Sequence, residues 1–364
     1  MASAHGRREF FRFAAGAAVG TVGIAGLPTI LTAKKTDSPL VLGEGEYKYE
    51  VTHDWPQLPG QFTWQTTQDI AIDKAGNVYV IHQGDAKKPD HPSIFVFDTD
   101  GKYVRSFGSE FQGGGHGIEV HQEGGEEFLY VTGYQAVKKF AKLSLDGKKI
   151  WERNAPMESG VYAKGEDTNR KAGKARNKFQ PTNIAFKPDG SGFYLTDGYG
   201  AYVVHVYDAD ANYKSTFGKP GKGIGEFDLP HGVWTDTRPG REPSVVVTDR
   251  LNNRLQWFTP DGKHLETLDG FVLPANVDTH GELMLVPELQ SRVTLLDGKN
   301  QVVARFGDDA EWRTKVEKDK VRQYPAQWPN GKFIHPHDAC FDADGNIFVC
   351  EWVATGRISK LRKV

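Results

Sequence analysis

Residues 66–82 read TTQDIAIDKAGNVYVIH, and residues 180–198 read QPTNIAFKPDGSGFYLTDG. Each stretch has a short alternating run typical of a β-strand, a turn rich in Asp, Gly or Asn, and a second apolar run. The same pattern returns four more times, at residues 114–133, 229–249, 273–286 and 335–351. The chain therefore contains a six-fold internal repeat.

Most repeats continue with two more strand-like runs before the next repeat begins. In the first repeat, residues 93–98 form the third run, a second Asp-Gly turn follows, and the fourth run ends at Phe107-Gly108. Four strands joined by tight hairpins form one blade of a β-propeller. We therefore predict an all-β, six-bladed β-propeller over residues 45–364.

Both ends of this region fit a closed ring. The last repeat stops at Val364 after its third run, and residues 47–55 have the composition of a strand that belongs to no repeat. We predict that this N-terminal strand completes the last blade, which leaves no free sheet edge at the seam. Two insertions, residues 152–178 and 308–333, explain the two longest intervals between repeats.

The composition fits one large β domain. The chain of 364 residues has 41 Gly, 19 Pro and 12% aromatic residues, which suits many turns and aromatic packing between blades. A mean hydropathy of −0.53 excludes a polytopic membrane protein. The net charge of −2 gives no basic surface for nucleic acid, so we expect no nucleic-acid partner. We expect a monomer.

The N-terminal segment resembles a twin-arginine export signal. Arg7 and Arg8 would be the arginine pair, and residues 13–31 form a weakly apolar, Ala/Gly-rich run without acidic residues. We predict an export signal over residues 1–35, read by the twin-arginine translocation machinery, and a linker over residues 36–44. The protein would then be periplasmic or secreted.

Cleavage of this segment stays open. A site after Ala33 fits poorly, because Leu31-Thr32-Ala33 is not a small-x-small sequence. An uncleaved segment would tether the protein to the membrane. Beyond the signal segment we expect no integral membrane domain.

The two cysteines, Cys340 and Cys350, flank the turn of the last repeat. They could approach each other across the hairpin. We predict buried free thiols instead, because a chain of this size needs no disulfide framework.

One position of the repeat indicates a metal site. The residue just before the first strand of each repeat is, in order, Gln68, His116, Thr182, His231, Ala275 and His337. Blades of a six-fold ring lie roughly 60° apart, so histidines in alternate blades would converge on the central channel. Three imidazoles with an open fourth position match a catalytic zinc site.

Two alternatives to this zinc site remain. Imidazole ligands also suit copper, nickel or iron. Each Pro-His pair could also be a turn that enters a strand, with the histidine hydrogen-bonded to the next blade. Four other histidines lack a comparable spacing and are expected to be structural: His82, His121, His205 and His335.

The repeats resemble NHL-repeat propellers, and within that group the chain resembles peptidyl-α-hydroxyglycine α-amidating lyase, the lyase domain of the peptide α-amidating enzymes. Its Asp197-Gly198-Tyr199 and Pro336-His337-Asp338 elements are more specific than the generic Asp-Arg-x-Asn-x-Arg signature. The matching stretches follow the family's order and are residues 70–73, 82–85, 116–118, 180–183, 196–199, 229–231, 248–256 and 336–338.

The resemblance implies two metal ions. The zinc ligands of the family fall on the three histidines named above. A structural calcium in the channel would use the carboxylate of Asp338 and the backbone carbonyls of Ile70 and Ile118. Oxygen ligands of this kind suit a hard cation.

The resemblance also implies a carbon–nitrogen lyase that splits the α-hydroxyglycine end of a peptide, or a related small molecule, into an amide and glyoxylate. Tyr199 matches the catalytic tyrosine, which can act as a base if the metal lowers its pKa from ~10. Its alternative role is an aromatic filler after a turn. Gln83 replaces a family arginine and cannot supply its charge. Arg250 matches a second family arginine.

The two insertions enter directly before Thr182 and His337. In the first, residues 165–178 are basic and turn-rich, whereas in the second, residues 308–323 have the pattern of a charged helix that carries Trp312, followed by Trp328 in a Pro-bounded loop. We hypothesise that both form a lid that selects an acidic ligand, although solvated surface loops are an alternative.

Two functions therefore follow from the sequence. The first is a metal-dependent lyase at the channel mouth. The other is a non-catalytic propeller that binds a protein or peptide partner, with the metal pinning the ring. The three-histidine pattern argues against lactonase-type propellers, which centre calcium on acidic and Asn ligands.

Overall fold

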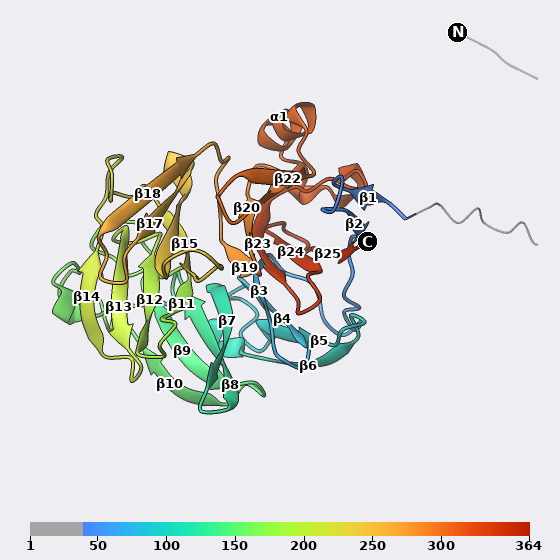
Figure 1. Ribbon diagram of the computed structural model, residues 1–364. Coiled ribbons are helices and arrows are strands. Elements are labelled where there is room, and N and C mark those ends of the chain that lie inside the picture. The colour runs from blue at the N-terminus through green and yellow to red at the C-terminus, as the bar shows by residue number, and fades with distance from the viewer. Residues whose placement is uncertain (1–38) are drawn as a thin grey trace, which may run out of the picture. The chain divides into compact units, whose positions relative to one another are not determined.

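The computed structural model describes residues 39–364, which form six antiparallel sheets arranged as the blades of a β-propeller (Figure 1). The predicted signal over residues 1–35 lies outside the described residues. The fold predicted from the repeat is therefore confirmed.

The blades are numbered here in the order of their first strands. Blade 1 contains β3 (Thr67–Ile72), β4 (Val78–His82), β5 (Ile94–Phe97) and β6 (Tyr103–Phe107). Blade 2 contains β7 (Gly115–Glu123), β8 (Glu126–Gly133), β9 (Lys139–Ser144) and β10 (Lys149–Arg153). Blade 3 contains β11 (Ile184–Phe186), β12 (Gly192–Asp197), β13 (Val203–Asp208) and β14 (Tyr213–Phe217).

The second half of the ring repeats this plan. Blade 4 contains β15 (Pro230–Asp236), β16 (Ser244–Asp249), β17 (Arg254–Phe258) and β18 (His264–Asp269). Blade 5 contains β19 (Asp278–His280), β20 (Leu283–Glu288), β21 (Arg292–Leu296) and β22 (Val302–Phe306). Blade 6 contains β23 (Pro336–Phe341), β24 (Ile347–Glu351), β25 (Ile358–Lys363), β2 (Tyr49–Thr52) and β1 (Val41–Leu42).

Blade 6 closes the ring as predicted. The N-terminal strand β2 pairs antiparallel with the C-terminal strand β25, with Val51 opposite Leu361. The short strand β1 then pairs with β2, so the sheet begins within the stretch assigned to the linker. The seam is thus held by backbone hydrogen bonds between the two ends of the domain.

Apolar faces of neighbouring blades pack against each other. Between blades 2 and 3, the ring centroids of Phe140 and Tyr207 are 5.1 Å apart, and Tyr207 also stacks on Phe193 of its own blade with centroids 5.0 Å apart. Offset and tilted aromatic pairs of this kind add stability beyond the area they bury. First strands of neighbouring blades contact each other around most of the ring, which places them around the central channel.

The insertions have little regular structure. The first holds one 3-10 turn, η2 (Met157–Ser159). The second holds α1 (Ala310–Lys318), η4 (Val321–Gln323) and η5 (Pro325–Gln327). The carboxylate of Asp309 caps α1 by accepting the backbone N–H of Trp312 at 2.9 Å, and Trp312 is buried as the helix anchor. No helix in residues 39–364 is long and apolar enough to cross a membrane.

His82, at the end of β4, is buried in the core in its neutral form, which makes the stability of the fold depend on pH. Its ring packs on Phe95 with centroids 4.8 Å apart, and within the described residues neither ring nitrogen has a hydrogen-bond partner. Burial, with a smaller effect of His91, lowers the pKa of His82 to about 3. The unfolded chain binds this proton near pH 6.5, so the protonation favours unfolding as the pH falls.

We therefore expect His82→Phe to be more stable than the wild type in acid. The difference in the free energy of unfolding should grow by about 1.4 kcal/mol for each pH unit between 6 and 4, because only the wild type gains a proton on unfolding at this position. Urea denaturation of both proteins at pH 6, 5 and 4 measures it. A difference that stays constant with pH would refute the assignment.

Candidate metal centre

The three predicted histidines lie on the first strands of alternate blades, His116 on β7, His231 on β15 and His337 on β23. Each sits at a break in strand pairing: the registers of β7, β15 and β23 with their partners all shift at this point. A β-bulge turns a side chain away from the regular alternation of a strand. The three bulges direct the imidazoles into the channel.

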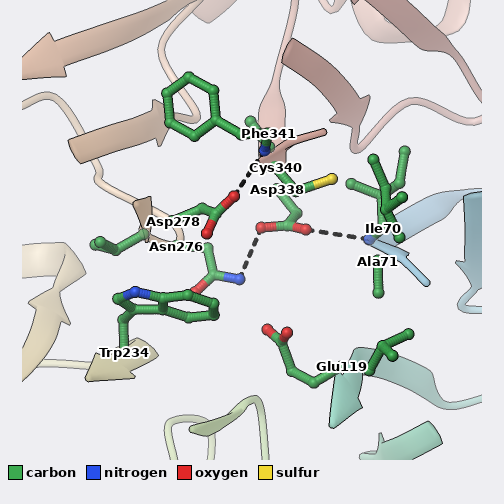
Figure 2. Close-up of a pocket in the computed structure, with 13 residues that line it drawn as sticks. Ile70, Ala71, Glu119, Trp234, Asn276, Asp278, Asp338, Cys340 and Phe341 are labelled. Atoms are coloured by element: carbon green, nitrogen blue, oxygen red, sulfur yellow. Dashed lines mark hydrogen bonds between the residues drawn. The ribbon is translucent and has the colours of Figure 1, made fainter. Parts of the chain in front are cut away.

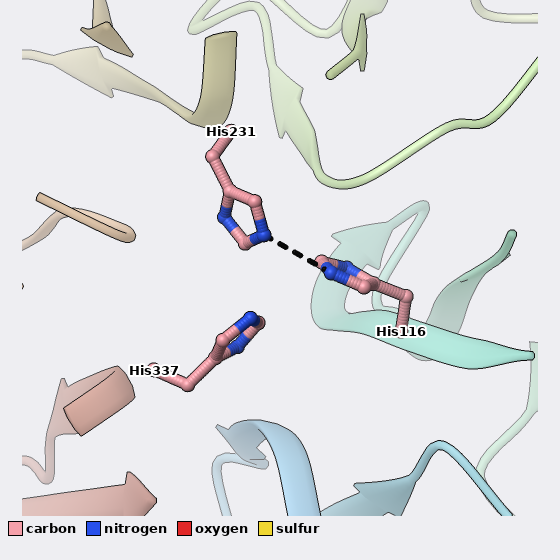
Figure 3. A group of neighbouring side chains, drawn as sticks. All are labelled: His116, His231 and His337. Atoms are coloured by element: carbon pink, nitrogen blue, oxygen red, sulfur yellow. Dashed lines mark hydrogen bonds between the residues drawn. The ribbon is translucent and has the colours of Figure 1, made fainter. Parts of the chain in front are cut away.

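There the imidazoles converge on one point (Figure 3). The ring centroids of His116 and His231 are 4.7 Å apart, those of His231 and His337 are 4.6 Å apart, and those of His116 and His337 are 5.1 Å apart. One ring nitrogen from each residue lies within 4.8 Å of the other two. The arrangement that the repeat predicts is therefore present, and it could hold a metal ion.

Backbone carbonyls of the intervening blades orient all three rings. The Nδ1 atoms of His116 and His231 lie 2.8 Å from the carbonyl oxygens of Thr182 and Ala275, and the Nδ1 atom of His337 lies 2.6 Å from that of Gln68. A carbonyl can only accept, so each Nδ1 carries the proton and donates. Each Nε2 is then unprotonated and carries a free lone pair, and this tautomer of histidine can bind a metal ion through Nε2.

The electrostatics agree with this assignment. Burial lowers the pKa of His116 to about 3 and lowers the pKa values of His231 and His337 well below the usual range. The rings are therefore neutral near pH 7. The Nε2 atoms of His116 and His231 face each other at 3.0 Å with no proton between them in this tautomer. A zinc ion bonded to two imidazoles separates their nitrogens by about 3.3 Å, so the donor set fits such a cation.

The glycine after two of the histidines reflects close packing of the next blade. A Cβ atom on Gly117 would lie 2.5 Å from the carbonyl oxygen of Thr182, and one on Gly232 would lie 2.5 Å from Oδ1 of Asn276. No side chain fits at either position. The His-Gly pairs thus let the imidazole-orienting carbonyls come within hydrogen-bonding distance.

A layer of oxygen atoms that could bind a cation lies next to the histidines, on residues one position after the six aligned ones. Asp338 accepts a hydrogen bond from Nδ2 of Asn276 at 2.7 Å and one from the backbone N–H of Ile70 at 3.1 Å (Figure 2). Asp69 accepts from Nδ2 of Asn183 at 3.2 Å. In the described residues, Oδ1 of Asn183 and Oδ1 of Asn276 have no partner.

These oxygens fit the calcium site implied by the resemblance. Burial and repulsion by the carboxylate of Asp338 raise the pKa of Asp69 well above its usual value, and burial raises the pKa of Asp338. A hard cation would favour the ionised form of both and would satisfy the free amide oxygens. Asp338, Ile70 and Glu119 line a cavity of about 130 Å³ here, while Ile118 is buried beside it.

Sequence reasoning identified only part of this layer. The residues that follow the six aligned positions include Asp69, Asn183, Asn276 and Asp338. Reading this second column of the repeat would have found all four. The channel therefore combines three histidines with the acidic and Asn oxygens that the sequence analysis associated with lactonase-type propellers.

On the histidine side, the channel opens into a cavity of about 530 Å³, lined in part by His337. Every blade contributes a residue just after its second strand. These residues are Gln83, Tyr134, Tyr199, Arg250, Leu289 and Trp352. Tyr134, Leu289 and Trp352 were missed by the sequence analysis, although the same column of the repeat contains them.

Tyr199 and Arg250 lie directly beside the histidines. The hydroxyl of Tyr199 lies 3.0 Å from Nε2 of His231, and Nη1 of Arg250 donates to the same hydroxyl at 3.3 Å. Burial raises the pKa of Tyr199, and the Arg250 guanidinium opposes that shift. Within residues 39–364, Nε and Nη2 of Arg250 are buried without a partner. They form a donor pair suited to a carboxylate.

Buried carboxylates hold these two residues in place. The side chain of Asp197 accepts the backbone N–H groups of Gln180 and Ala201 at 2.8 and 2.9 Å, which shapes the turn that carries Tyr199. Asp249 accepts from Nε of Arg254 at 2.7 Å and so leaves Arg250 without an acidic partner. Gln83 accepts a hydrogen bond from the side-chain amide of Gln68 at 3.1 Å.

The two insertions differ in their relation to the cavity. Residues 172–174 of the first insertion line it. The second insertion contributes none of the lining residues described, but Nε of Arg322 donates to the carbonyl of Trp352 at 2.7 Å and its guanidinium stacks on that indole. The first insertion thus forms part of the wall, and the second supports the wall from behind.

The cysteines lie beside the oxygen layer. Cys350 is buried, Cys340 is partly buried, and both are free thiols as predicted. Cys340 lies opposite Phe348 and Cys350 opposite Asp338 in the β23–β24 pairing, so the two are not cross-strand partners.

No protein-family model matches the chain. Many solved structures share its fold, including the following three. It is similar to a streptogramin B lyase, with 14% identity and a TM-score of 0.54 over 88% of this chain and 99% of that one. Virginiamycin B lyase from Staphylococcus aureus is 14% identical, with a TM-score of 0.52 over 87% of this chain and 100% of that one. A structural genomics protein of unknown function from Bacteroides thetaiotaomicron is 11% identical, with a TM-score of 0.55 over 87% and 77%.

Among curated proteins, a stretch of 50 residues is 50% identical to Protein lin-41 of Caenorhabditis elegans. The match covers 14% of this chain and 4% of that protein. At these identities and coverages, the comparisons support the propeller fold and carry no residue roles.

Proposed function

We propose that this protein is a zinc-dependent carbon–nitrogen lyase that cleaves peptidyl-α-hydroxyglycine, or a close relative of it, to an amide and glyoxylate. The observation that supports it most is the set of three Nε2 lone pairs beside Tyr199 and Arg250 at the floor of one cavity. The names of two structural neighbours agree with a lyase, although that likeness extends to the fold alone.

Each group has a role in this proposal. His116, His231 and His337 would hold the zinc ion, which when bound would stabilise the negative charge developing on the substrate hydroxyl. The free Nε and Nη2 atoms of Arg250 would bind the substrate carboxylate. The oxygen layer would hold calcium next to the zinc site.

The reaction balances without a further reactant. Tyr199 would accept the proton of the substrate hydroxyl, and the electron pair of that O–H bond would form the carbonyl of glyoxylate. The carbon–nitrogen bond breaks as the carbonyl forms, and its electron pair goes to the nitrogen. The nitrogen takes up the proton and leaves as the amide.

In the metal-free site the tyrosine is neutral near pH 7, because burial raises its pKa. A neutral phenol can take the substrate proton only while it releases its own, so the hydroxyl proton of Tyr199 would pass to the leaving nitrogen as the carbon–nitrogen bond breaks. We also propose export by the twin-arginine route, carried by residues 1–35, which lie outside the described part of the chain.

Tyr199→Phe tests the proposal. We expect glyoxylate release from an α-hydroxyglycine peptide to fall at least ~100-fold, the range for loss of a general acid–base group. Zinc content should not change, because the phenol is not one of the three imidazole ligands. Turnover and zinc would be measured on the same samples, with Tyr213→Phe as the matched control, since Tyr213 lies on the outer strand β14.

The outcomes separate the two functions. If zinc-loaded wild-type protein releases no glyoxylate, the result would favour a non-catalytic propeller that binds a peptide or protein. Equal turnover in the wild type and Tyr199→Phe would remove the tyrosine from the mechanism.

A further inference from the structure

The wall of the 530 Å³ cavity is apolar above its polar floor. Four leucines line it, one each from the segments that precede β15 and β19 and the segments that follow β16 and β20: Leu229, Leu273, Leu251 and Leu289. All four are incompletely buried, and Leu251 keeps 46% of its surface exposed. Apolar side chains left uncovered in a concave site mark a surface that an apolar ligand covers.

Two of these leucines adopt a backbone conformation that disfavours leucine. Leu229 has φ 65° and Leu273 has φ 57°, both in the left-handed region. Glycine or asparagine adopts this region at lower cost. Strain of this kind persists where surrounding structure enforces it, and it clusters at functional sites.

Backbone hydrogen bonds enforce the strain. The carbonyl of Leu229 accepts the N–H of Arg250 at 3.2 Å, and the carbonyl of Leu273 accepts the N–H of Leu289 at 3.0 Å. Each strained leucine is thus tied to the cavity-lining residue that follows the second strand of its own blade. The leucine side chain adds nothing to these bonds, so its presence points to a role in the cavity.

The charges in the cavity have one sign. Among the lining residues of residues 39–364, the formally charged side chains are Arg250 and Lys174, both cations. The guanidinium of Arg250 keeps two donors free. A ligand that matches both features has an anion at one end and an apolar body at the other.

We propose that the substrate is an acid with a hydrophobic acyl body, whose carboxylate binds Arg250 and whose body lies against Leu229, Leu251, Leu273 and Leu289. This inference rests on the proposed function for the nature of the scissile end. Leu229 and Leu273 are the specificity-determining residues, because each retains a leucine at a backbone position that glycine or asparagine would fill at lower cost.

The test uses N-acetylglycine, N-hexanoylglycine and N-decanoylglycine, which carry the carboxylate but lack the hydroxyl and are not cleaved. Isothermal titration of the zinc-loaded protein should show affinity rising roughly fourfold for each fully buried methylene, and at least about tenfold from the acetyl to the hexanoyl compound. Equal affinities across the series, or no binding of any member, would overturn the proposal.

Leu273→Asn locates the apolar contact. Asparagine tolerates the left-handed region, so the midpoint of unfolding should not fall. The variant should bind N-decanoylglycine about tenfold more weakly and N-acetylglycine as the wild type does. Leu265→Asn, at an exposed leucine of β18 outside the cavity, is the matched control and should leave both affinities unchanged. Equal weakening of both ligands in Leu273→Asn would contradict the specific role.

This experiment fails independently of the proposed lyase. If affinity rises steeply with the length of the acyl chain but the protein releases no glyoxylate, only the proposed reaction would be refuted, because these ligands bind without turnover. If affinity does not change with chain length in a protein that releases glyoxylate, only the proposed apolar body of the substrate would be refuted.

Discussion

His231→Ala is expected to reduce bound zinc from about one ion per chain to almost none. The residue supplies one of three Nε2 donors, and its Nε2 lies 3.0 Å from that of His116 and 3.0 Å from the hydroxyl of Tyr199. Loss of an outer-shell partner alone weakens metal binding 10- to 100-fold. Loss of a ligand that also orients two neighbours should weaken it at least ~100-fold.

Metal analysis of purified wild type, His231→Ala and His264→Ala measures this effect. His264 lies on the outer strand β18, where its Nε2 atom is hydrogen-bonded to Thr267 at 2.8 Å, so His264→Ala should keep its zinc. Zinc retained in full by His231→Ala would contradict the assigned ligand. A wild type that binds none after zinc is supplied would contradict the metal centre itself.

Repetition in the sequence was sufficient to predict the fold and the three histidines. The six aligned positions fix which residue of each blade meets the channel, and alternation of His with Gln68, Thr182 and Ala275 then implies three-fold convergence. The structure adds the reason for alternation. The backbone carbonyls of the intervening residues hold the three Nδ1 protons.

Other parts of the site were not predictable in the same way. The sequence does not predict a left-handed backbone conformation at Leu229 or Leu273, because the Leu-Pro pairs that they form are typical of ordinary extended segments or turns. The contribution of the first insertion depends on a contact between residues of different segments, Lys138 and Glu166, which no periodicity marks. Repeats thus specify the floor and rim of the cavity, while irregular segments complete its wall.

Glu166→Gln should show how strongly the first insertion depends on that contact. Glu166 and Lys138 form a salt bridge with both side chains almost fully buried. Glu166 also accepts the backbone N–H of Phe179 at 3.0 Å and the Nζ of Lys178 at 3.0 Å. Glutamine keeps the shape but removes the charge, which leaves the buried Lys138 ammonium uncompensated. We expect the free energy of unfolding to fall by about 3–5 kcal/mol.

Glu166→Gln should also alter the wall of the cavity. Nζ of Lys138 also donates to the carbonyl of Lys171, one residue before the stretch 172–174 that lines the wall. Affinity for N-decanoylglycine should therefore fall together with stability.

Adding Lys138→Met to Glu166→Gln removes the unpaired cation, so this double variant should recover most of the stability. Urea denaturation of the wild type, both single variants and the double variant forms the thermodynamic cycle. If Glu166→Gln and Lys138→Met destabilise additively, the pair is not coupled, and the insertion is held in place by its backbone contacts instead.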